Sequence, residues 1–426
     1  MTTQTSIERV DAYLAEQASL DTLRFITCGS VDDGKSTLIG RMLYEAQLIF
    51  DDQVASLQSD SKKMGTQGGD IDFALLVDGL AAEREQGITI DVAYRFFSTD
   101  RRKFIVADTP GHEQYTRNMV TGASTADVAV ILIDARQGVL PQTRRHSMIC
   151  SSLGIKHIVV AVNKMDLVDY EKPVFDSIID DYAAFASQLK FESITPIPMS
   201  ALKGRNVVKR ATDTPWYKGP TLLGYLETVD TQHEKNTLPF RLPVQWVNRP
   251  NLDFRGFSGT IESGSIKPGD QIRIASSGAT ARVKEIILFE DALPSAQTGQ
   301  AVTLTLDQEI DASRGDLICS ATNPCETSDQ FQLEHVWMDQ ESGFLGRSYY
   351  LKIGATTVNA QITEIKYKVN INTCEHLAAT KLELNDLALV TLKTDKPISY
   401  ESFTTNPAMG SLILIDRMSK RDQPKT

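Results

Sequence analysis

Short apolar runs alternate with amphipathic stretches through the first half of the chain. Five runs rich in Val, Ile, Leu and Ala, each bounded by turn-forming residues, cover residues 23–28, 103–108, 127–134, 157–164 and 194–200. Runs of this length without polar alternation are typical of strands buried on both faces of a parallel sheet. We therefore expect the five runs to form one buried sheet.

A segment between the last two runs has the period of a helix. Within residues 171–190 the apolar side chains recur every three or four positions, at Val174, Ile178, Tyr182, Phe185 and Leu189. This spacing predicts one apolar helix face. Strands that alternate with helices predict a doubly wound α/β domain with a mostly parallel sheet, whose ligand lies beyond the carboxyl ends of the strands.

The pattern changes after residue 202. A polar connection contains one short predicted helix at 222–226, and from Pro239 onward short alternating segments are separated by turn residues. Such spacing is typical of β-barrels or sandwiches. The predicted parts are an amino-terminal extension (1–22), the α/β domain (23–238) and two β-barrel domains (239–327 and 328–426).

Acidic residues outnumber basic ones. The 426 residues include 44 Lys plus Arg and 55 Asp plus Glu, a net charge of −11. This charge argues against a protein that coats nucleic acid by bulk attraction to phosphates, although it does not argue against a local basic patch. Arg144, Arg145 and His146 form a candidate patch, and we interpret them as a solvent-exposed turn of helix. We do not expect a nucleic-acid partner.

The cysteines and the apolar runs bear on the compartment. The five cysteines are scattered and lack the spacing of metal ligands, which is typical of reduced thiols. Residues 1–17 carry acidic and polar side chains where a signal peptide needs an apolar run. No later stretch approaches the roughly 20 apolar residues of a membrane span. We expect a cytoplasmic protein without a membrane anchor.

The first apolar run leads directly into a phosphate-binding motif. Residues 29–36 read GSVDDGKS and precede a helical stretch, which fits G-x-x-x-x-G-K-[ST] between strand and helix. Gly29 and Gly34 let the backbone curl around a phosphate, Lys35 is expected to bridge the β- and γ-phosphates, and Ser36 is expected to ligate Mg²⁺. The predicted phosphate-binding residues are Gly29, Ser30, Val31, Asp32, Asp33, Gly34, Lys35, Ser36 and Thr37.

A second motif indicates which base is bound. NKMD follows the fourth apolar run and supplies Asn163, Lys164 and Asp166. Guanine offers an N1–H and an exocyclic amine, and one carboxylate such as Asp166 can accept both, whereas adenine has no such pair of donors on that edge. Ser200, Ala201 and Leu202 follow the last run and are expected to close the far side of the base.

The segment after the second run has the features of a γ-phosphate switch. Asp108 ends that run and can hold Mg²⁺ through water, and it is followed by Thr109, Pro110 and Gly111. The Gly111 amide can meet the γ-phosphate and rotate when that phosphate leaves. Upstream, Thr89 is a second candidate Mg²⁺ ligand. It lies in a long connection with a partly helical pattern, which suits an order–disorder switch.

Three residues are expected to act in hydrolysis: Lys35, Thr89 and His112. His112 directly follows Gly111, a position from which it can orient the attacking water, with Val31 and Ile88 as apolar walls around it. Asp32 leaves two interpretations open, because it could ligate a monovalent cation or cap a turn.

The motifs occur in the order found in translational GTPases of the elongation factor Tu type, which the chain resembles over nearly its whole length: GSVDDGKS, GITI, DTPGHEQ, NKMD and SAL, then GTIESGSIKPGD. That resemblance implies a P-loop GTPase domain followed by two β-barrel domains. It also implies GTP or GDP and Mg²⁺ as ligands.

The resemblance narrows further in residues 78–147, which are very similar to the GTPase subunit of heterodimeric bacterial ATP sulfurylase. In that family GTP hydrolysis is coupled to the otherwise uphill formation of adenylyl sulfate and pyrophosphate from ATP and sulfate. The resemblance implies a smaller catalytic subunit as partner, which uses the ATP and sulfate, in a heterodimer or higher assembly.

The chemistry of sulfate activation is expected to lie elsewhere. In the 426 residues we find no SGGxDS-like pyrophosphate loop and no second GxxxxGK[ST] motif. We therefore expect neither adenylyl transfer nor a fused adenylyl-sulfate kinase. Two alternatives stay open. One is a translation factor that delivers aminoacyl-tRNA, and the other is a nucleotide-binding scaffold without hydrolysis, against which intact Thr89, Asp108 and His112 count.

Overall fold

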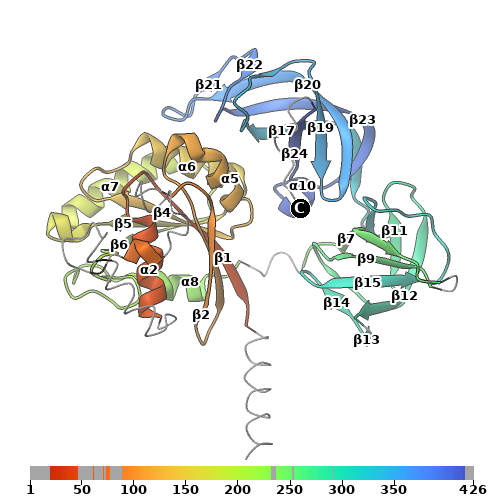
Figure 1. The fold of residues 1–426 in the computed structure, drawn as a ribbon, viewed down its shortest axis with the longest axis horizontal. Helices are drawn as coiled ribbons and strands as arrows, with labels where there is room; N and C mark the ends of the chain where they lie inside the picture. Colours follow the sequence, from red (N-terminus) through yellow and green to blue (C-terminus); the bar gives the residue numbers. More distant parts are fainter. Residues whose placement is uncertain are drawn as a thin grey trace, which may run out of the picture. The chain divides into compact units, whose positions relative to one another are not determined.

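The fold is described from a computed structural model (Figure 1). The structure describes residues 20–46, 61, 71, 73–76, 89–231, 237–251, 254–289 and 291–417. The chain divides into two compact units. Unit 1 comprises Met1–Val229 with Asn370–Glu375, and unit 2 comprises Asp230–Val369 with His376–Thr426.

Unit 1 is built on one sheet with strand order β2-β3-β1-β4-β5-β6. The five predicted runs form its parallel strands: β1 (Thr22–Cys28), β3 (Lys103–Asp108), β4 (Val128–Asp134), β5 (His157–Asn163) and β6 (Ser193–Pro198). The edge strand β2 (Ala93–Ser98) pairs antiparallel with β3 and was not expected. Its exposed Tyr94 and Phe96 alternate with less exposed residues, so it lacks the continuous apolar run of a central strand.

Helices cover both faces of this sheet (Figure 1). One face carries α2 (Lys35–Glu45) and α8 (Leu222–Thr228), whose leucines share a core with Phe25 and Val130. The other face carries α5 (Thr116–Ala123), α6 (Pro141–Ser152) and α7 (Lys172–Ala186). Short 3₁₀ turns are η1 (Phe73–Leu76), η2 (Glu113–Tyr115) and η3 (Met165–Val168).

The prediction of which residues form the apolar face of α7 is partly wrong. Ile178, Tyr182 and Phe185 are buried as expected, but the helix ends at Ala186, so Leu189 lies beyond it. Phe175 is buried in place of the half-buried Val174. A helix advances 3.6 residues per turn, and Phe175 falls three residues before Ile178 on the same face.

Unit 2 contains two larger antiparallel sheets. The first has the order β7-β16-β11-β12-β15-β9-β8, with β13 beside β12, and the second has the order β17-β23-β20-β19-β24, with β21 beside β20. Its elements are β7 (Arg241–Pro243), β8 (Trp246–Asn248), β9 (Gly256–Thr260), β10 (Ser265–Ile266), β11 (Gln271–Ile274), β12 (Thr280–Leu288), β13 (Asp291–Leu293), β14 (Ala296–Gln297), β15 (Ala301–Leu306), β16 (Leu317–Ser320), β17 (Glu326–Val336), β18 (Gly343–Phe344), β19 (Ser348–Ile353), β20 (Thr356–Val369), β21 (His376–Leu377), β22 (Lys381–Leu382), β23 (Leu387–Tyr400), α10 (Pro407–Gly410) and β24 (Ile413–Asp416).

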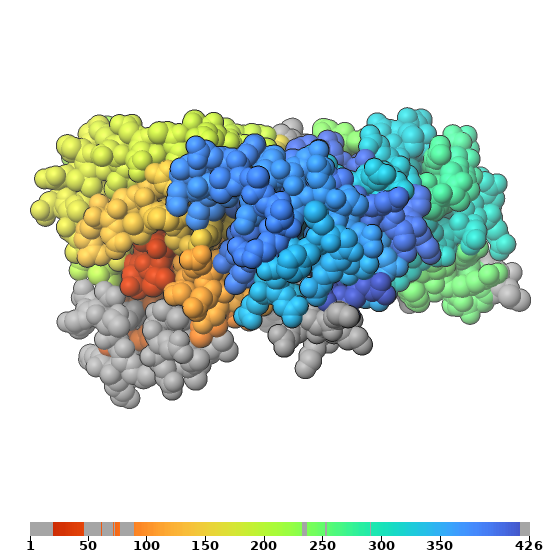
Figure 2. Space-filling model, turned by 90° about the horizontal axis from the view of Figure 1, so that it is seen from above, coloured from red at the N-terminus to blue at the C-terminus, as the bar shows by residue number. Residues whose placement is uncertain are grey.

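The two sheets of unit 2 have separate apolar cores and a polar junction. At the junction the buried Arg241 donates from Nε to Glu401 Oε1 at 2.6 Å, and Thr356 donates to the Gly315 carbonyl at 2.7 Å. Figure 2 shows the two parts, green to cyan and blue, adjoining each other. Each sheet encloses its own apolar core, so the contacts described between the two sheets are made by polar side chains.

Candidate functional site

The loop at residues 29–36 leaves the carboxyl end of β1 and enters α2. Gly34 is the N-cap of α2 and has φ +92°, a left-handed conformation that favours glycine. A Cβ there would lie 2.6 Å from Asn163 Nδ2, so no larger residue fits. A helix amino terminus preceded by such a loop presents backbone N–H groups to an anion.

Lys35 is held inside this loop. Its Nζ donates to the Ser30 carbonyl at 2.6 Å, and burial lowers its pKa from the ordinary value. Asp33, also buried, accepts from the Ser30 N–H at 2.5 Å, and burial raises its pKa to about 6. The loop is closed by its own contacts, and the Lys35 ammonium lies where phosphate oxygens could replace its carbonyl partner. Asp32 is exposed with φ +64°, and both interpretations of it stay open.

Three oxygens converge below the loop. Ser36 Oγ donates to Asp108 Oδ2 at 2.8 Å and lies 3.3 Å from Thr89 Oγ1. Thr27, a residue that the sequence analysis missed, donates to Asp108 Oδ1 at 3.3 Å and orients the carboxylate. Among the described residues no group of three or more His, Cys, Asp or Glu side chains could hold a metal. This set of hydroxyl and carboxylate oxygens does fit Mg²⁺, which prefers hard oxygen ligands.

Asn163 joins three predicted segments. Its Nδ2 donates to the Asp33 carbonyl at 2.8 Å, and its Oδ1 accepts from the Ala201 N–H at 2.9 Å. The amide is 2% exposed, so both bonds are shielded from water. The phosphate loop, the NKMD segment and the 200–202 loop therefore meet at one edge of the sheet.

The neighbouring Lys164 is fixed by a carboxylate that the sequence analysis did not single out. Asp134, at the end of β4, lies 3.2 Å from Lys164 Nζ and accepts from Arg136. Burial raises the pKa of Asp134, but hydrogen bonds from Arg136 and Lys164 lower it further, to about 2. In the described part of the chain, no hydrogen bond to the Asp166 carboxylate is formed, so its oxygens are open to a ligand.

Arg41 holds the 200–202 loop through hydrogen bonds to its backbone carbonyls. It lies on α2, donates from Nε to the Ala201 carbonyl at 3.0 Å and contacts the Leu202 carbonyl through Nη2. Its guanidinium stacks over Phe73 at 4.1 Å from the ring centroid. Ser200 is fully buried and its Oγ accepts from the Lys203 N–H. Arg41 lies outside every recognised motif, which is why sequence reasoning missed it.

The switch segment follows β3 at the same edge. Thr109 is buried and donates to the Thr27 carbonyl at 2.7 Å, and a Cβ on Gly111 would lie 2.6 Å from Lys35 Nζ. His112 is exposed and caps η2 by accepting from the Gln114 N–H at 3.3 Å. Val31 is half-buried, whereas Ile88 and most of the predicted helical pattern before it lie outside the described residues.

The expectation for residues 144–146 was wrong. His146 is fully buried and its Nδ1 accepts from the Gly29 N–H at 3.2 Å, while the Arg145 side chain is only 12% exposed. Burial, with the positive charges of Lys35 and Arg145, lowers the pKa of His146 to about 3. The buried residues Thr143, His146 and Cys150 are spaced three and four apart on α6. That period could have placed His146 on the inner face.

Comparison with known proteins identifies the family. Residues 20–235 match the elongation factor Tu GTP binding domain, and residues 330–421 match the GTP-eEF1A C-terminal domain-like family. Sulfate adenylyltransferase subunit 1 of Aliarcobacter butzleri (strain RM4018) is 54% identical over 411 residues, which cover 96% of this chain and 88% of that protein. The chain belongs to the sulfate adenylyltransferase subunit 1 family. The resemblance drawn from the sequence is confirmed, and the edge described above is part of a guanine-nucleotide-binding domain.

Two further relatives define the limits of the likeness. The bifunctional enzyme NodQ of Rhizobium sp. (strain N33) is 56% identical over 407 residues, but this member of the subunit 1 family spans only 63% of NodQ's length. The S. cerevisiae Ski7 GTPase-like domain, solved with GDP and inorganic phosphate, is 19% identical with a TM-score of 0.54, over 96% of this chain and 97% of that one. That likeness concerns the fold alone, and the predicted fold class is confirmed.

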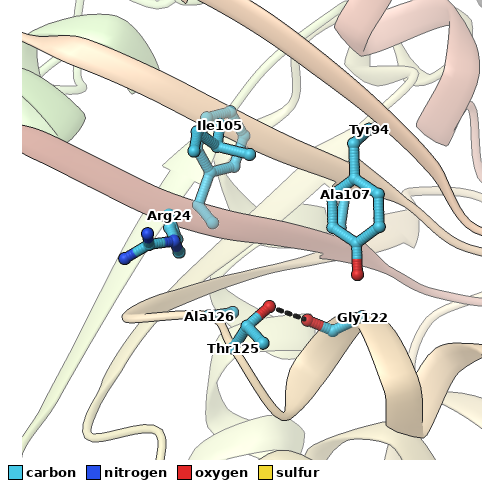
Figure 3. Close-up of a pocket in the computed structure, with 8 residues that line it drawn as sticks. Arg24, Tyr94, Ile105, Ala107, Gly122, Thr125 and Ala126 are labelled. Carbon is cyan, nitrogen blue, oxygen red and sulfur yellow. Dashed lines mark hydrogen bonds between the residues drawn. The ribbon is translucent and has the colours of Figure 1, made fainter. Parts of the chain in front are cut away.

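Figure 3 shows the residues that line a cavity of about 240 Å³ in this subunit 1 family member. Arg24, Tyr94, Ile105 and Thr125 line it, near the start of β1 and the end of α5. The P-loop follows the opposite end of β1, so this cavity is separate from the candidate site. Among the described helices, none combines the length and apolar character needed to cross a membrane.

Proposed function

We propose that the chain binds and hydrolyses GTP, and that hydrolysis drives adenylyl transfer from ATP to sulfate on a partner subunit. The observation that carries the first half is the Asn163 side chain, which holds the phosphate loop and the 200–202 loop together. A nucleotide spanning from Lys35 to Asp166 would contact both ends of this arrangement. The names of the relatives, which are sulfate adenylyltransferase subunits, support the second half of the proposal.

The phosphate end of the site would act by positioning and charge. Lys35 and the amides of residues 29–36 would bind the β- and γ-phosphates. Ser36, Thr89 and Asp108 would hold Mg²⁺, whose charge neutralises phosphate oxygens when the ion is bound. The Ser36 hydroxyl donates its hydrogen to Asp108, which leaves the lone pairs of its oxygen for a cation.

The base end would recognise guanine through Asp166. Its two carboxylate oxygens match the N1–H and the exocyclic amine of guanine. Asp134 Oδ2 lies 3.2 Å from Lys164 Nζ, so the aliphatic part of the Lys164 side chain is fixed beside the proposed position of the base. Ser200, Ala201 and Leu202, supported by Arg41, would close the other side.

Hydrolysis would depend on His112. The residue is exposed and directly follows Gly111, so its ring is available to orient a water toward the γ-phosphate. We expect His112→Ala to keep GTP binding and to slow hydrolysis by about 100-fold, because positioning a water stabilises the transition state only. Single-turnover hydrolysis with saturating GTP measures this, and full turnover would assign the role to another residue.

The coupled reaction would take place on a smaller catalytic subunit that uses ATP and sulfate. We expect a heterodimer or a higher assembly in the cytoplasm, with GTP bound by this chain. The relatives at 54% identity carry the name of a sulfate adenylyltransferase subunit, which favours this function over aminoacyl-tRNA delivery.

One experiment tests the coupling. The chain is co-purified with the smaller subunit it retains, and pyrophosphate release from ATP and sulfate is measured with GTP, with GDP and with a non-hydrolysable GTP analogue. We expect stimulation by GTP, and loss of that stimulation in the His112→Ala complex. GTP turnover that responds to ribosomes and not to sulfate would contradict the coupling and support the translation alternative.

A further inference from the structure

Helix α6 of unit 1 contacts both the phosphate loop and the switch segment. Its His146 accepts from the first amide of the loop, at Gly29, and its Arg145 pairs with Glu113, the residue that follows His112. The two contacts come from adjacent positions on one helix. A rigid helix can therefore relate the position of one segment to that of the other.

The contact with the switch segment is an ion pair. Arg145 Nη2 lies 2.8 Å from Glu113 Oε1, with the arginine side chain 12% exposed and the glutamate 60% exposed. Glu113 is the first residue of η2, the turn that His112 caps. Holding Glu113 therefore also restrains the backbone that carries the His112 ring.

Gln142 lies beside both Arg145 and His146 on α6. Its side-chain amide lies 3.0 Å from His146 Nε2, and its Oε1 accepts from Arg145 Nη1 at 2.7 Å. Because His146 Nδ1 accepts from Gly29, the neutral ring carries its proton on Nε2. The Gln142 oxygen is engaged by Arg145, so the 3.0 Å approach of the Gln142 amide nitrogen to His146 Nε2 is a packing contact between the two side chains.

We propose that Arg145 is a positioning residue for GTP hydrolysis. It fixes the start of η2, and with it His112, relative to the phosphate loop, because Arg145 pairs with Glu113 while the adjacent His146 of the same helix accepts from Gly29. The inference rests on the proposed GTP hydrolysis by this site. Arg145 itself touches no reacting atom, because its guanidinium is engaged by Glu113 and Gln142.

The neighbouring arginine supplies a matched control. Arg144 pairs with Asp181 at 3.4 Å and lies over the Phe185 ring, both on α7. Arg144→Gln and Arg145→Gln remove the same charge from consecutive positions of one helix. Only the Arg145→Gln substitution removes the ion pair with Glu113.

Single-turnover GTP hydrolysis and GDP affinity of the full chain test the proposal. We expect Arg145→Gln and Glu113→Gln each to slow hydrolysis about fivefold, the effect of a partly exposed ion pair. GDP affinity should change less than about twofold. The double variant should be no slower than either single variant, and the exchange E113R with R145E should recover part of the rate. A general loss of packing would not be recovered by that exchange.

Two results would overturn the proposal. One is Arg145→Gln hydrolysing GTP at the rate of Arg144→Gln, and the other is additive losses in the double variant, which would mean that the two side chains act separately. Absence of GTP turnover in the unmodified chain would instead overturn the proposed function, and this inference with it. The two failures are therefore distinguishable.

Discussion

At the residue scale, we propose that the carboxylate of Asp166 decides which base is bound. We expect Asp166→Asn to weaken GDP binding by about 10- to 100-fold, because one of two charge-assisted acceptors becomes a donor. Affinity for xanthosine diphosphate should rise, since its extra carbonyl accepts from the new amide. Asp169→Asn, three residues later and exposed, is the control. Unchanged GDP affinity in Asp166→Asn would remove the assignment.

His146 makes the stability of unit 1 depend on pH. Its pKa is about 3 when folded, against 6.5 for a free histidine, so below 6.5 the unfolded chain binds a proton that the folded chain does not. The stabilisation is complete above pH 6.5 and is lost as pH falls, by about 1.4 kcal/mol per unit. Hydrogen exchange of β4 and β5 measures this. We expect His146→Gln to have a shallower slope than the unmodified chain, and equal slopes would contradict the burial argument.

At the scale of the elements, we propose that contacts between α2 and the 200–202 loop determine how tightly the base is bound. Arg41 joins α2 to the 200–202 loop, so we expect Arg41→Ala to weaken GDP binding about tenfold by loosening that loop. Hydrolysis at saturating GTP should be unchanged, because the γ-phosphate end is not touched. Arg24→Ala, on β1 beside the separate cavity, is the control. An equal fall in hydrolysis at saturation would place Arg41 in the phosphate machinery.

Sequence reasoning succeeded where local pattern and local chemistry agree. Continuous apolar runs gave the five parallel strands, and because parallel strands end at one edge, the motifs after them could be expected to meet. Thr27, Arg41 and Asp134 were not foreseen, since each acts through a partner that is distant in sequence. His146 was misjudged because residue type was weighed above its helical period.

At the scale of the whole molecule, the two sheets of unit 2 are joined by a buried ion pair. Arg241 is 1% exposed and pairs with Glu401, which also accepts from Asn406 at 2.9 Å. We expect Arg241→Ala to destabilise unit 2 by about 3–5 kcal/mol, because Glu401 is left without its partner. Arg255→Ala removes a looser pair, 3.8 Å from the fully exposed Asp311, and should cost less than about 1 kcal/mol.

Urea unfolding followed by tryptophan fluorescence measures the difference between these variants when Trp216 of unit 1 is replaced by Phe, because the remaining Trp246 and Trp337 both lie in unit 2. Equal stabilities for Arg241→Ala and Arg255→Ala would show that the junction does not depend on its charge pair.

The proposed function requires one guanine nucleotide to bind across the edge of the sheet where residues 29–36 and 163–166 meet. Calorimetric titration of the full chain with GDP and with ADP, both with Mg²⁺, tests this most directly. We predict a single GDP site per chain that is lost in Lys35→Ala, with no measurable heat for ADP. No heat with GDP, or equal affinity for ADP, would contradict the account.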